Sequence, residues 1–382
     1  MLVAALAALT AVIWLALLFG RGFYWLGRVR DDERVPAPAC WPSVVAVIPA
    51  RNEAAVIGEA VGSLMRQDYP GALSVIVVDD DSNDGTAAVA QAAGAGSARV
   101  LTVLKGEPLA AGWTGKLWAL RQGIAAAEEC APDLLLLTDA DIAHAPDSLS
   151  WLVAKAARDG TVLTSFMAKL RCESLAERIH VPAFIYFFEM LYPFAWVRQP
   201  KARTAAAAGG CVLLKADALR QAGGIESIRN ALIDDCSLAR RMKAVGPIWL
   251  GLTERVHSIR PYESFADVRQ MISRSAYAQL NFSPWLLIGT LVGMTLTYLA
   301  APALAVFAQG WPQLVGIAVW AAMALSFVPT LRFYRLSPIW GIALPGIAML
   351  YALYTFESAW KHWRRRGGQW KGRVHVNAPS LQ

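Results

Sequence analysis

Two carboxylates one residue apart, Asp139 and Asp141, follow an apolar run in the stretch DLLLLTDADI at residues 133–142. Four leucines bounded by polar residues predict a short strand buried on both faces, as in a parallel sheet covered by helices. Open α/β sheets bind their ligands at the carboxyl ends of such strands. Two carboxylates there can hold a hard divalent cation such as Mg²⁺ or Mn²⁺, which in turn can carry a diphosphate. The alternative is that either aspartate only caps the next helix.

Two further predicted strands also end in polar side chains. The strand at residues 43–48 runs on through PARN to Glu53, and the strand at residues 73–78 ends in DDDSNDGT, which contains Asp80. Turns rich in Asp, Asn, Ser and Gly are common, because these side chains bond to nearby backbone and cap helices. A plain turn is therefore the alternative for each strand end.

Lys116 and the pair Asp234-Asp235 lie at the starts of predicted helices. The amino end of a helix is already positive, so a lysine there is unfavourable unless an anion also binds. A solvated lysine is the alternative. Asp234 and Asp235 can act on a ligand, or they can simply cap their helix. Gly209 and Gly210 precede an apolar run, as where backbone passes close to a ligand.

From residue 43 onwards, short β-branched runs alternate with helical stretches, which predicts a parallel, doubly wound α/β sheet. Besides the leucine run, the predicted strands cover residues 43–48, 73–78, 100–104, 161–166 and 249–257, and the predicted helices cover residues 53–65, 86–93 and 146–157.

The composition indicates a membrane protein, because 56% of the 382 residues are apolar, only 17% are charged and 15 are tryptophan. Residues 1–20 are predicted to be an uncleaved anchor, since Arg21 and Arg28 follow the apolar run and no basic residue precedes it. This orientation places the next domain in the cytosol. The net charge of +7 does not require nucleic acid as a partner, because much of it flanks apolar runs and can face anionic headgroups. The five scattered cysteines fit a reduced cytosolic domain.

The predicted parts of the chain are the anchor at residues 1–20, a linker at 21–42, an α/β domain at 43–280, a transmembrane region at 281–357 and a basic cytosolic tail at 358–382. No charged residue lies between Arg274 and Arg332, which leaves room for spans at residues 285–307 and 314–328. A third candidate span covers residues 336–356. Three full spans would place the basic tail outside, so one apolar segment is re-entrant, interfacial or doubled.

An aromatic stretch at residues 181–197 contains Glu189 and two prolines. If it crossed the membrane, Asp235 would lie on the opposite side from Asp139, and the two carboxylates could not share one site. We therefore predict an interfacial helix whose aromatic side chains lie at headgroup depth and can receive a lipid. The alternative is that they only anchor the domain. The side chains concerned are Tyr186, Phe187, Phe188, Tyr192 and Trp196.

Taken in order, these motifs resemble those of the family-2 glycosyltransferases, membrane-associated enzymes that use a nucleotide sugar on a Rossmann-like sheet of the GT-A type. The similar segments are VIPARNEA (47–54), VVDDDSNDGT (77–86), GKLWAL (115–120), TDADI (138–142), AAGGCVLLK (207–215) and IDDCSLA (233–239). The details, including the closing ESAWKHWRRRGGQWKGRV, are most similar to the hopanoid-associated branch. Ceramide glucosyltransferases are more distant relatives.

The resemblance implies a role for each polar residue. Asp235 matches the catalytic base, which is needed because an acceptor hydroxyl has a pKa far above neutrality and must lose its proton as it attacks the anomeric carbon. The metal offsets charge that develops on the leaving nucleotide diphosphate. A single displacement of this kind inverts the anomeric centre. The other implied roles are nucleotide binding by Glu53, Asp80, Lys116 and Asp139, metal binding by Asp139 and Asp141, and acceptor or diphosphate contacts by Arg274 and Asp234.

The resemblance also implies a multi-pass protein of the inner (plasma) membrane with a cytosolic catalytic domain. We expect it to move a UDP-linked sugar to a lipid hydroxyl, in hopanoid biosynthesis. Where the family often has Q-x-x-R-W, Arg274 takes the arginine place but Met271 and Ser275 replace the flanking residues. This departure argues against a polysaccharide synthase, which stays an alternative together with a catalytically inactive nucleotide-binding scaffold. A transporter is disfavoured, because the predicted spans lack charged residues. His144 and His257 can approach a metal, although a lone histidine is more often a surface or packing residue.

Overall fold

The computed structural model describes residues 1–364, 369–370 and 373–374, and the chain divides into two compact units. The sheet unit takes Val29–Arg171, Trp196–Pro261 and the described residues of Gln369–Gln382, and the helical unit takes Met1–Arg28, Cys172–Ala195 and the described residues of Tyr262–Gly368. Near the end of the chain, β9 (Gln369–Trp370) and β10 (Arg373–Val374) pair with each other. The basic tail predicted from residue 358 falls in part, with Arg365, Arg366 and Lys371, outside the described residues.

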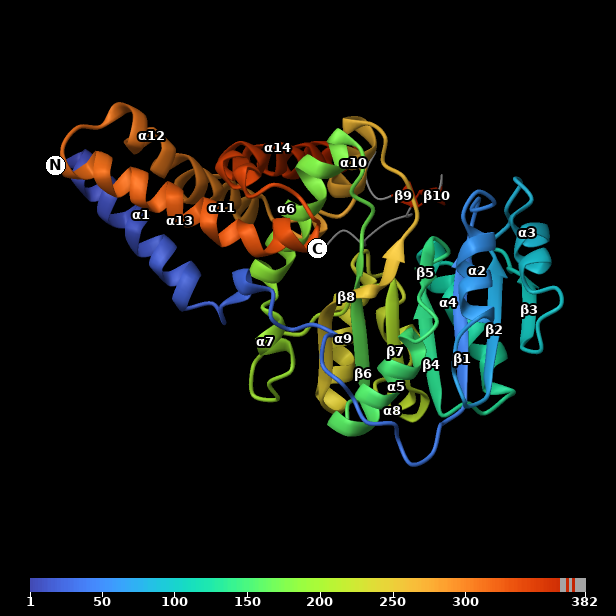
Figure 1. Ribbon diagram of the computed structural model, residues 1–382. Helices are drawn as coiled ribbons and strands as arrows, with labels where there is room; N and C mark the ends of the chain where they lie inside the picture. The colour runs from blue at the N-terminus through green and yellow to red at the C-terminus, as the bar shows by residue number, and fades with distance from the viewer. Residues whose placement is uncertain (365–368, 371–372, 375–382) are drawn as a thin grey trace. The chain divides into compact units, whose positions relative to one another are not determined.

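An eight-stranded sheet in the order β3-β2-β1-β4-β7-β6-β8-β5 forms the centre of the sheet unit (Figure 1). Its strands are β1 (Val44–Ala50), β2 (Leu73–Asp79), β3 (Val100–Lys105), β4 (Leu134–Thr138), β5 (Ile142–His144), β6 (Leu163–Lys169), β7 (Cys211–Lys215) and β8 (Ile248–Ser258). The first four strands are parallel, β7 is antiparallel to β4 and β6, and β5 is antiparallel to β8.

The predicted α/β sheet is therefore confirmed, but the prediction that it is wholly parallel is wrong. A parallel neighbour requires a crossover of a dozen or more residues. Only residues 139–141 separate β4 from β5, so β5 turns away from β4 and pairs with β8. All five residues of β4 are buried, as the leucine run predicts. The short turn brings the two carboxylates to the carboxyl end of this central strand.

Helices cover both faces of the sheet, as the alternation of side chains along β1 requires. Ala46 and Ile48 pack in one cluster with Ile57 of α2. Val47 points to the opposite face and lies so close to α4 that a Cβ on Gly123 would be 2.4 Å from it. The helices of this unit are α2 (Ile57–Met65), α3 (Thr86–Ala93), α4 (Gly115–Glu128), α5 (Ser148–Asp159), α8 (Ala216–Gln221) and α9 (Asp234–Val245), with a 3-10 turn η2 (Ile225–Ile228).

In the described part of the chain, the helical unit holds four helices long and apolar enough to cross a membrane: Leu2–Phe19, Pro284–Phe307, Trp311–Phe333 and Pro338–Trp363. Each predicted span falls on one of them. The elements of this unit are α1 (Leu2–Phe19), η1 (Tyr24–Leu26), α6 (Leu175–Leu191), α10 (Phe265–Ser273), η3 (Ala278–Leu280), α11 (Pro284–Met294), η4 (Thr295–Leu299), α12 (Ala300–Phe307), α13 (Trp311–Phe333), η5 (Pro338–Ala343) and α14 (Leu344–Trp363). The short α7 (Phe194–Val197) follows α6 in the chain.

Most of the aromatic stretch at residues 181–197 lies on α6, and part of its aromatic surface is buried. The Tyr186 ring packs edge-on against Phe327, and the Phe187 ring packs edge-on against Tyr351. Tyr186 is fully buried and Phe187 is 8% exposed. The prediction that these two side chains lie on the surface is therefore wrong. An apolar helix that packs inside a helical core has the same composition as one that lies on a bilayer, so the sequence pattern does not separate the two.

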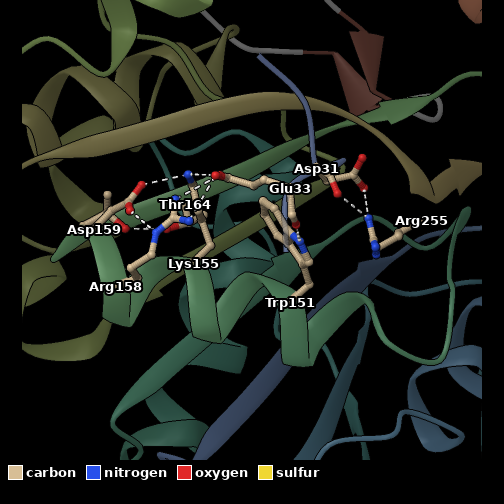
Figure 2. A network of polar contacts seen from close by, with 9 residues as sticks. Asp31, Glu33, Trp151, Lys155, Arg158, Asp159, Thr164 and Arg255 are labelled. Atoms are coloured by element: carbon tan, nitrogen blue, oxygen red, sulfur yellow. Dashed lines mark hydrogen bonds and ion pairs between the residues drawn. The ribbon is translucent and has the colours of Figure 1, made fainter. Parts of the chain in front are cut away.

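Part of the predicted linker is fixed on the sheet unit (Figure 2). Leu252 of β8 donates a 2.9 Å backbone hydrogen bond to Val29 and accepts one of 3.2 Å from Asp31. Two residues further on, Glu33 forms a double hydrogen bond with the Arg158 guanidinium, at 2.9 and 3.0 Å. The linker thus covers a strand edge of β8 that β5 is too short to reach. This network also includes Trp151, Lys155, Asp159 and Arg255.

Candidate active site

The carboxyl end of β4 lies between two basic side chains of the sheet unit. The Lys116 ammonium is 2.8 Å from an oxygen of Asp139 and 3.1 Å from an oxygen of Asp234. The Arg260 guanidinium is 2.7 Å from an oxygen of Asp141. The structure therefore brings together the carboxylates of the β4 turn, the lysine of α4 and the acidic start of α9.

Lys116 is positioned in the first turn of α4, whose N-cap is Thr114. The anion that this position requires is supplied by the protein itself, through Asp139 and Asp234. Burial acts to lower the pKa of Lys116, but the two carboxylates outweigh it, and the pKa lies above its ordinary value. The lysine is therefore a permanent cation between the β4 turn and α9.

Asp235 is held by two backbone donors at the start of α9. One oxygen accepts a 3.0 Å hydrogen bond from the N–H of Gly209, and the other accepts one of 2.6 Å from the N–H of Cys236. Burial, followed by the charge of Asp234, raises the pKa of Asp235 to about 6, against the opposing effects of Lys116 and the two N–H groups. A carboxylate with this pKa is ionised at neutral pH yet more basic than usual, as a general base must be.

The Gly209-Gly210 turn comes close to these side chains, so the predicted close approach of backbone occurs here. A Cβ on Gly209 would lie 3.2 Å from the Lys116 ammonium. The carbonyl of Gly210 accepts a 2.7 Å hydrogen bond from the Thr138 hydroxyl at the end of β4. Thr138 also lies 3.0 Å from the buried His144 imidazole. The turn is thereby tied both to β4 and to Asp235.

The ends of β1 and β2 meet on the other side of Arg260. The guanidinium lies 2.6 and 2.7 Å from the two oxygens of Glu53. Arg51 lies 3.7 Å from a carboxylate oxygen of Asp80, whose side chain is 1% exposed. In the turn after β2, Asp84 accepts hydrogen bonds from the backbone N–H groups of residues 54 and 86. For Asp84, the structure therefore supports the alternative of a plain capping role.

The acidic side chains of this region outnumber its cations, which is the balance that a divalent metal requires. Asp139 and Asp141 supply the oxygen donors that Mg²⁺ and Mn²⁺ prefer. Burial, and then the charge of Asp141, act to raise the pKa of Asp139 in opposition to Lys116, and the pKa lies above its ordinary value. A dication would relieve this repulsion. Among the described residues, no group of three or more acidic, histidine or cysteine side chains is arranged as a complete metal cage. Asp139 and Asp141 alone would leave most coordination positions of such a metal for other ligands.

The sequence also singles out Arg274 and His257. Arg274 is exposed at the end of α10 in the helical unit, and its proposed contact with acceptor or diphosphate stays a prediction. His257 is exposed on β8, where its backbone pairs with that of Ala143 in β5.

Arg260 belongs to this cluster of charged side chains but carries no motif in the sequence. Its position shortly after the strand predicted at residues 249–257 is the signal in the sequence that could have identified it. A basic residue at that position can reach the acidic ends of neighbouring strands.

A mixed sheet of this order, with acidic side chains after β4 and at the start of α9, is the Rossmann-like fold of the GT-A glycosyltransferases. Residues 42–276 match the family model described as glycosyltransferase like family 2, and the chain belongs to that family. The family assigned from the motifs is thus confirmed, whereas the hopanoid-associated branch stays a prediction.

Relatives match over parts of their length. Over 129 residues the chain is 39% identical to an N-acetylglucosaminyltransferase of Rhizobium leguminosarum bv. viciae. This match covers 33% of this chain and 27% of that protein. Over 100 residues it is 36% identical to a 4,4'-diaponeurosporenoate glycosyltransferase of Staphylococcus aureus (strain bovine RF122 / ET3-1). This match covers 26% of this chain and 24% of that protein. The chain thus spans about a quarter of the length of these relatives.

A solved structure is similar over most of the chain. The mannosyltransferase PcManGT from Pyrobaculum calidifontis, in complex with GDP-Man and Mn²⁺, superimposes with a TM-score of 0.56 at 21% identity. The superposition covers 92% of this chain and 99% of that one. At this identity the likeness establishes the fold.

Proposed function

We propose that the protein is a membrane-bound inverting glycosyltransferase that transfers a sugar from a nucleotide sugar to a hydroxyl group of a membrane lipid. The observation that carries this proposal is the environment of Asp235. Its carboxylate is fixed by the N–H of Gly209, has a pKa near 6, and lies on the same helix turn as Asp234, the partner of Lys116. A positioned base beside a cation and a metal-type carboxylate pair is what such a displacement needs.

In the proposed reaction, the acceptor oxygen forms a bond to the anomeric carbon while the bond from that carbon to the nucleotide diphosphate breaks. The acceptor proton passes to Asp235, and the leaving diphosphate retains the electron pair of the broken bond. Attack from the face opposite the leaving group inverts the anomeric centre. Lys116, held as a cation by Asp139 and Asp234, contributes positive charge beside the diphosphate.

The donor-binding roles follow from the positions of the acidic strand ends. Glu53 and Asp80, at the ends of β1 and β2, would hold the nucleoside, and Asp139 with Asp141 would hold Mg²⁺ or Mn²⁺. When bound, the metal would offset the charge of the leaving diphosphate. The complex of PcManGT with GDP-Man and Mn²⁺ supports this arrangement by analogy of fold.

Several observations favour a lipid acceptor and a membrane location. Four helices of the described chain are long and apolar enough to cross a bilayer. One similar protein is named for diaponeurosporenoate, a carotenoid-like lipid. The closing motif at the carboxyl end of the chain resembles that of the hopanoid-associated branch, so we propose a hopanoid as the lipid and a UDP-linked sugar as the donor. The catalytic domain would face the cytosol, because basic residues follow the first apolar helix.

Lipid mass spectrometry of cells with and without the protein tests this proposal. We expect a lipid that carries one added sugar to disappear when the protein is removed and to return with the wild-type chain. It should not return with Asp235→Asn. An inactive nucleotide-binding scaffold predicts no lost glycolipid, and a polysaccharide synthase predicts a lost polymer instead.

A further inference from the structure

We propose that Arg260 is a built-in counter-ion of Asp141, which it holds at the carboxylate oxygens that would bind the metal. When a nucleoside diphosphate and a divalent metal bind together, Arg260 moves from Asp141 to the diphosphate. This inference rests on the proposed metal role of Asp141. It also explains, through the single side chain of Arg260, why the metal and the nucleotide would bind together.

The first step is the geometry of Arg260. Its Nε lies 2.7 Å from Asp141, and one terminal nitrogen lies 2.6 and 2.7 Å from the two oxygens of Glu53. The guanidinium therefore bridges the turn after β4 and the turn after β1. Its side chain is 26% exposed, against 16% for Asp141 and 10% for Glu53, so the arginine is the most exposed of these three side chains.

The second step is the charge. A metal bound through Asp141 and a guanidinium in contact with Asp141 are both positive, and they compete for the same carboxylate oxygens. Metal binding must therefore displace Arg260 or accept repulsion from it. Asp139 is also paired with a cation, Lys116, which it shares with Asp234. Metal alone should consequently bind weakly.

The third step is the fate of the displaced guanidinium. Arginine is always protonated, and its planar donors match the oxygens of a phosphate. The two acidic partners of Arg260 are the residues assigned to the metal and the nucleoside, so a diphosphate between them lies within reach of the same side chain. A nucleoside diphosphate would thus give Arg260 a new partner and free Asp141 for the metal. This exchange makes each ligand improve the binding of the other.

Removal of the charge should have opposite effects on the two ligands. With Arg260→Gln, Mn²⁺ alone should bind about tenfold more tightly, since a carboxylate loses its competing cation. UDP or GDP in the presence of saturating Mn²⁺ should bind about tenfold more weakly, since the diphosphate loses a bidentate donor. The mutual enhancement of the two ligands should largely vanish. A purely structural role of Arg260 would instead weaken both.

The experiment uses the full chain in detergent, with free Mn²⁺ followed by electron paramagnetic resonance and with UDP and GDP titrated by calorimetry. Arg255→Gln is the matched control, because Arg255 lies on β8, shortly before Arg260 in the chain, and forms ion pairs with two aspartates, Asp31 and Asp147. It removes the same charge away from the site and should change neither affinity. Arg260→Lys keeps a positive charge and should bind Mn²⁺ more weakly than Arg260→Gln does. Equal melting temperatures of the wild type and Arg260→Gln confirm that folding is intact. If Arg260→Gln unfolds, Arg260→Lys tests the diphosphate contact instead: it keeps the charge beside Asp141, so Mn²⁺ alone should bind as in the wild type, but it loses the planar pair of donors, so UDP or GDP with Mn²⁺ should bind more weakly. Unchanged binding of UDP and GDP to that variant would contradict the inference.

Two different results would overturn the inference. If Arg260→Gln binds Mn²⁺ no more tightly than Arg255→Gln, while the wild type still transfers sugar in a metal-dependent way, the counter-ion role fails and the proposed function stands. If neither the wild type nor Arg260→Gln binds Mn²⁺ even with UDP or GDP, the metal role of Asp141 fails, and the counter-ion role fails with it.

Discussion

The backbone N–H of Gly209 donates a 3.0 Å hydrogen bond to the carboxylate of Asp235. This contact joins the turn before β7 to the first turn of α9, and it fixes the orientation of the side chain that we propose as the base. A Cβ at the donor position would lie 3.2 Å from the Lys116 ammonium, which is closer than most Cβ contacts, so the lysine would have to shift. Gly209→Ala should therefore disturb the ion pairs of Lys116 as well as the base.

Asp235→Asn should lower sugar transfer by about 10²–10⁴-fold, the range that a positioned general base contributes. The amide keeps the shape of the side chain but cannot take a proton from the acceptor. Binding of the nucleotide sugar, measured by calorimetry, should stay within a few-fold of the wild type. A parallel loss of binding and rate would assign Asp235 to the donor instead.

The raised pKa of Asp235 predicts how the rate depends on pH. The base must be ionised, so kcat should rise with pH through about 6 and level off above it. The acid limb is measured with saturating donor and acceptor. A limb near the ordinary aspartate pKa would show that Asp235 is not in the environment described above.

The same pKa shift predicts that the contribution of Asp235 to stability falls as the pH rises, whereas the rate increases. A carboxyl group with a raised pKa in the folded state stabilises the fold at low pH, and this contribution is lost as the pH rises through the folded-state value of about 6. Asparagine does not titrate. The melting temperature of Asp235→Asn, relative to the metal-free wild type, should therefore increase as the pH is raised from about 4 to about 7. A constant difference over this range would exclude the linkage.

Asp141→Asn should lower activity at least about tenfold in Mg²⁺ or Mn²⁺, because an amide lacks the charge that holds a hard dication. Excess chelator should abolish the activity of the wild type. Asp147→Asn is the control, since Asp147 is also paired with an arginine, Arg255, but lies on the exposed start of α5. Full activity of the wild type in chelator would contradict the metal role.

Glu33→Gln should destabilise the sheet unit through the linker network of Figure 2. The side chain of Lys155 is 5% exposed, and its ammonium pairs with both Glu33 and Asp159. Loss of one partner of a largely buried cation costs about 1–2 kcal/mol when the other partner remains and the lost one is partly exposed. Circular dichroism should show a melting temperature about 2–5 °C lower.

The control for this prediction is Asp217→Asn, which removes an exposed ion pair with Arg220. Exposed pairs of this kind contribute little, so its melting temperature should match the wild type. If Glu33→Gln also matches the wild type, the linker is held by its backbone pairing with β8 alone.

The parts of the site that the sequence predicts are those with a local signal. Asp139 and Asp141 follow an apolar strand, and Lys116 and Asp235 lie at helix starts, so their place at one edge of the sheet follows from strand and helix direction. The structure brings these four side chains into one connected cluster. Their roles in binding and catalysis stay predictions.

The parts that the sequence does not predict depend on contacts between distant segments. Arg260 lies 207 positions after Glu53 and has no local pattern of its own. The antiparallel direction of β5 and β7 depends on which strands they pair with. The burial of Tyr186 depends on the helices around it, and the pairing of Asp31 with β8 depends on a strand edge far along the chain.

Transfer of radiolabelled sugar into an organic-soluble product tests the proposed function most directly. The full chain in detergent is incubated with labelled UDP- or GDP-sugars, Mn²⁺ and a hopanoid or other lipid extract, beside Asp235→Asn and Asp147→Asn. We predict a labelled lipid with inverted anomeric configuration for the wild type and Asp147→Asn, and at least about 10²-fold less for Asp235→Asn. A labelled lipid formed equally well by Asp235→Asn, or label found only in water-soluble products, would contradict the proposed function.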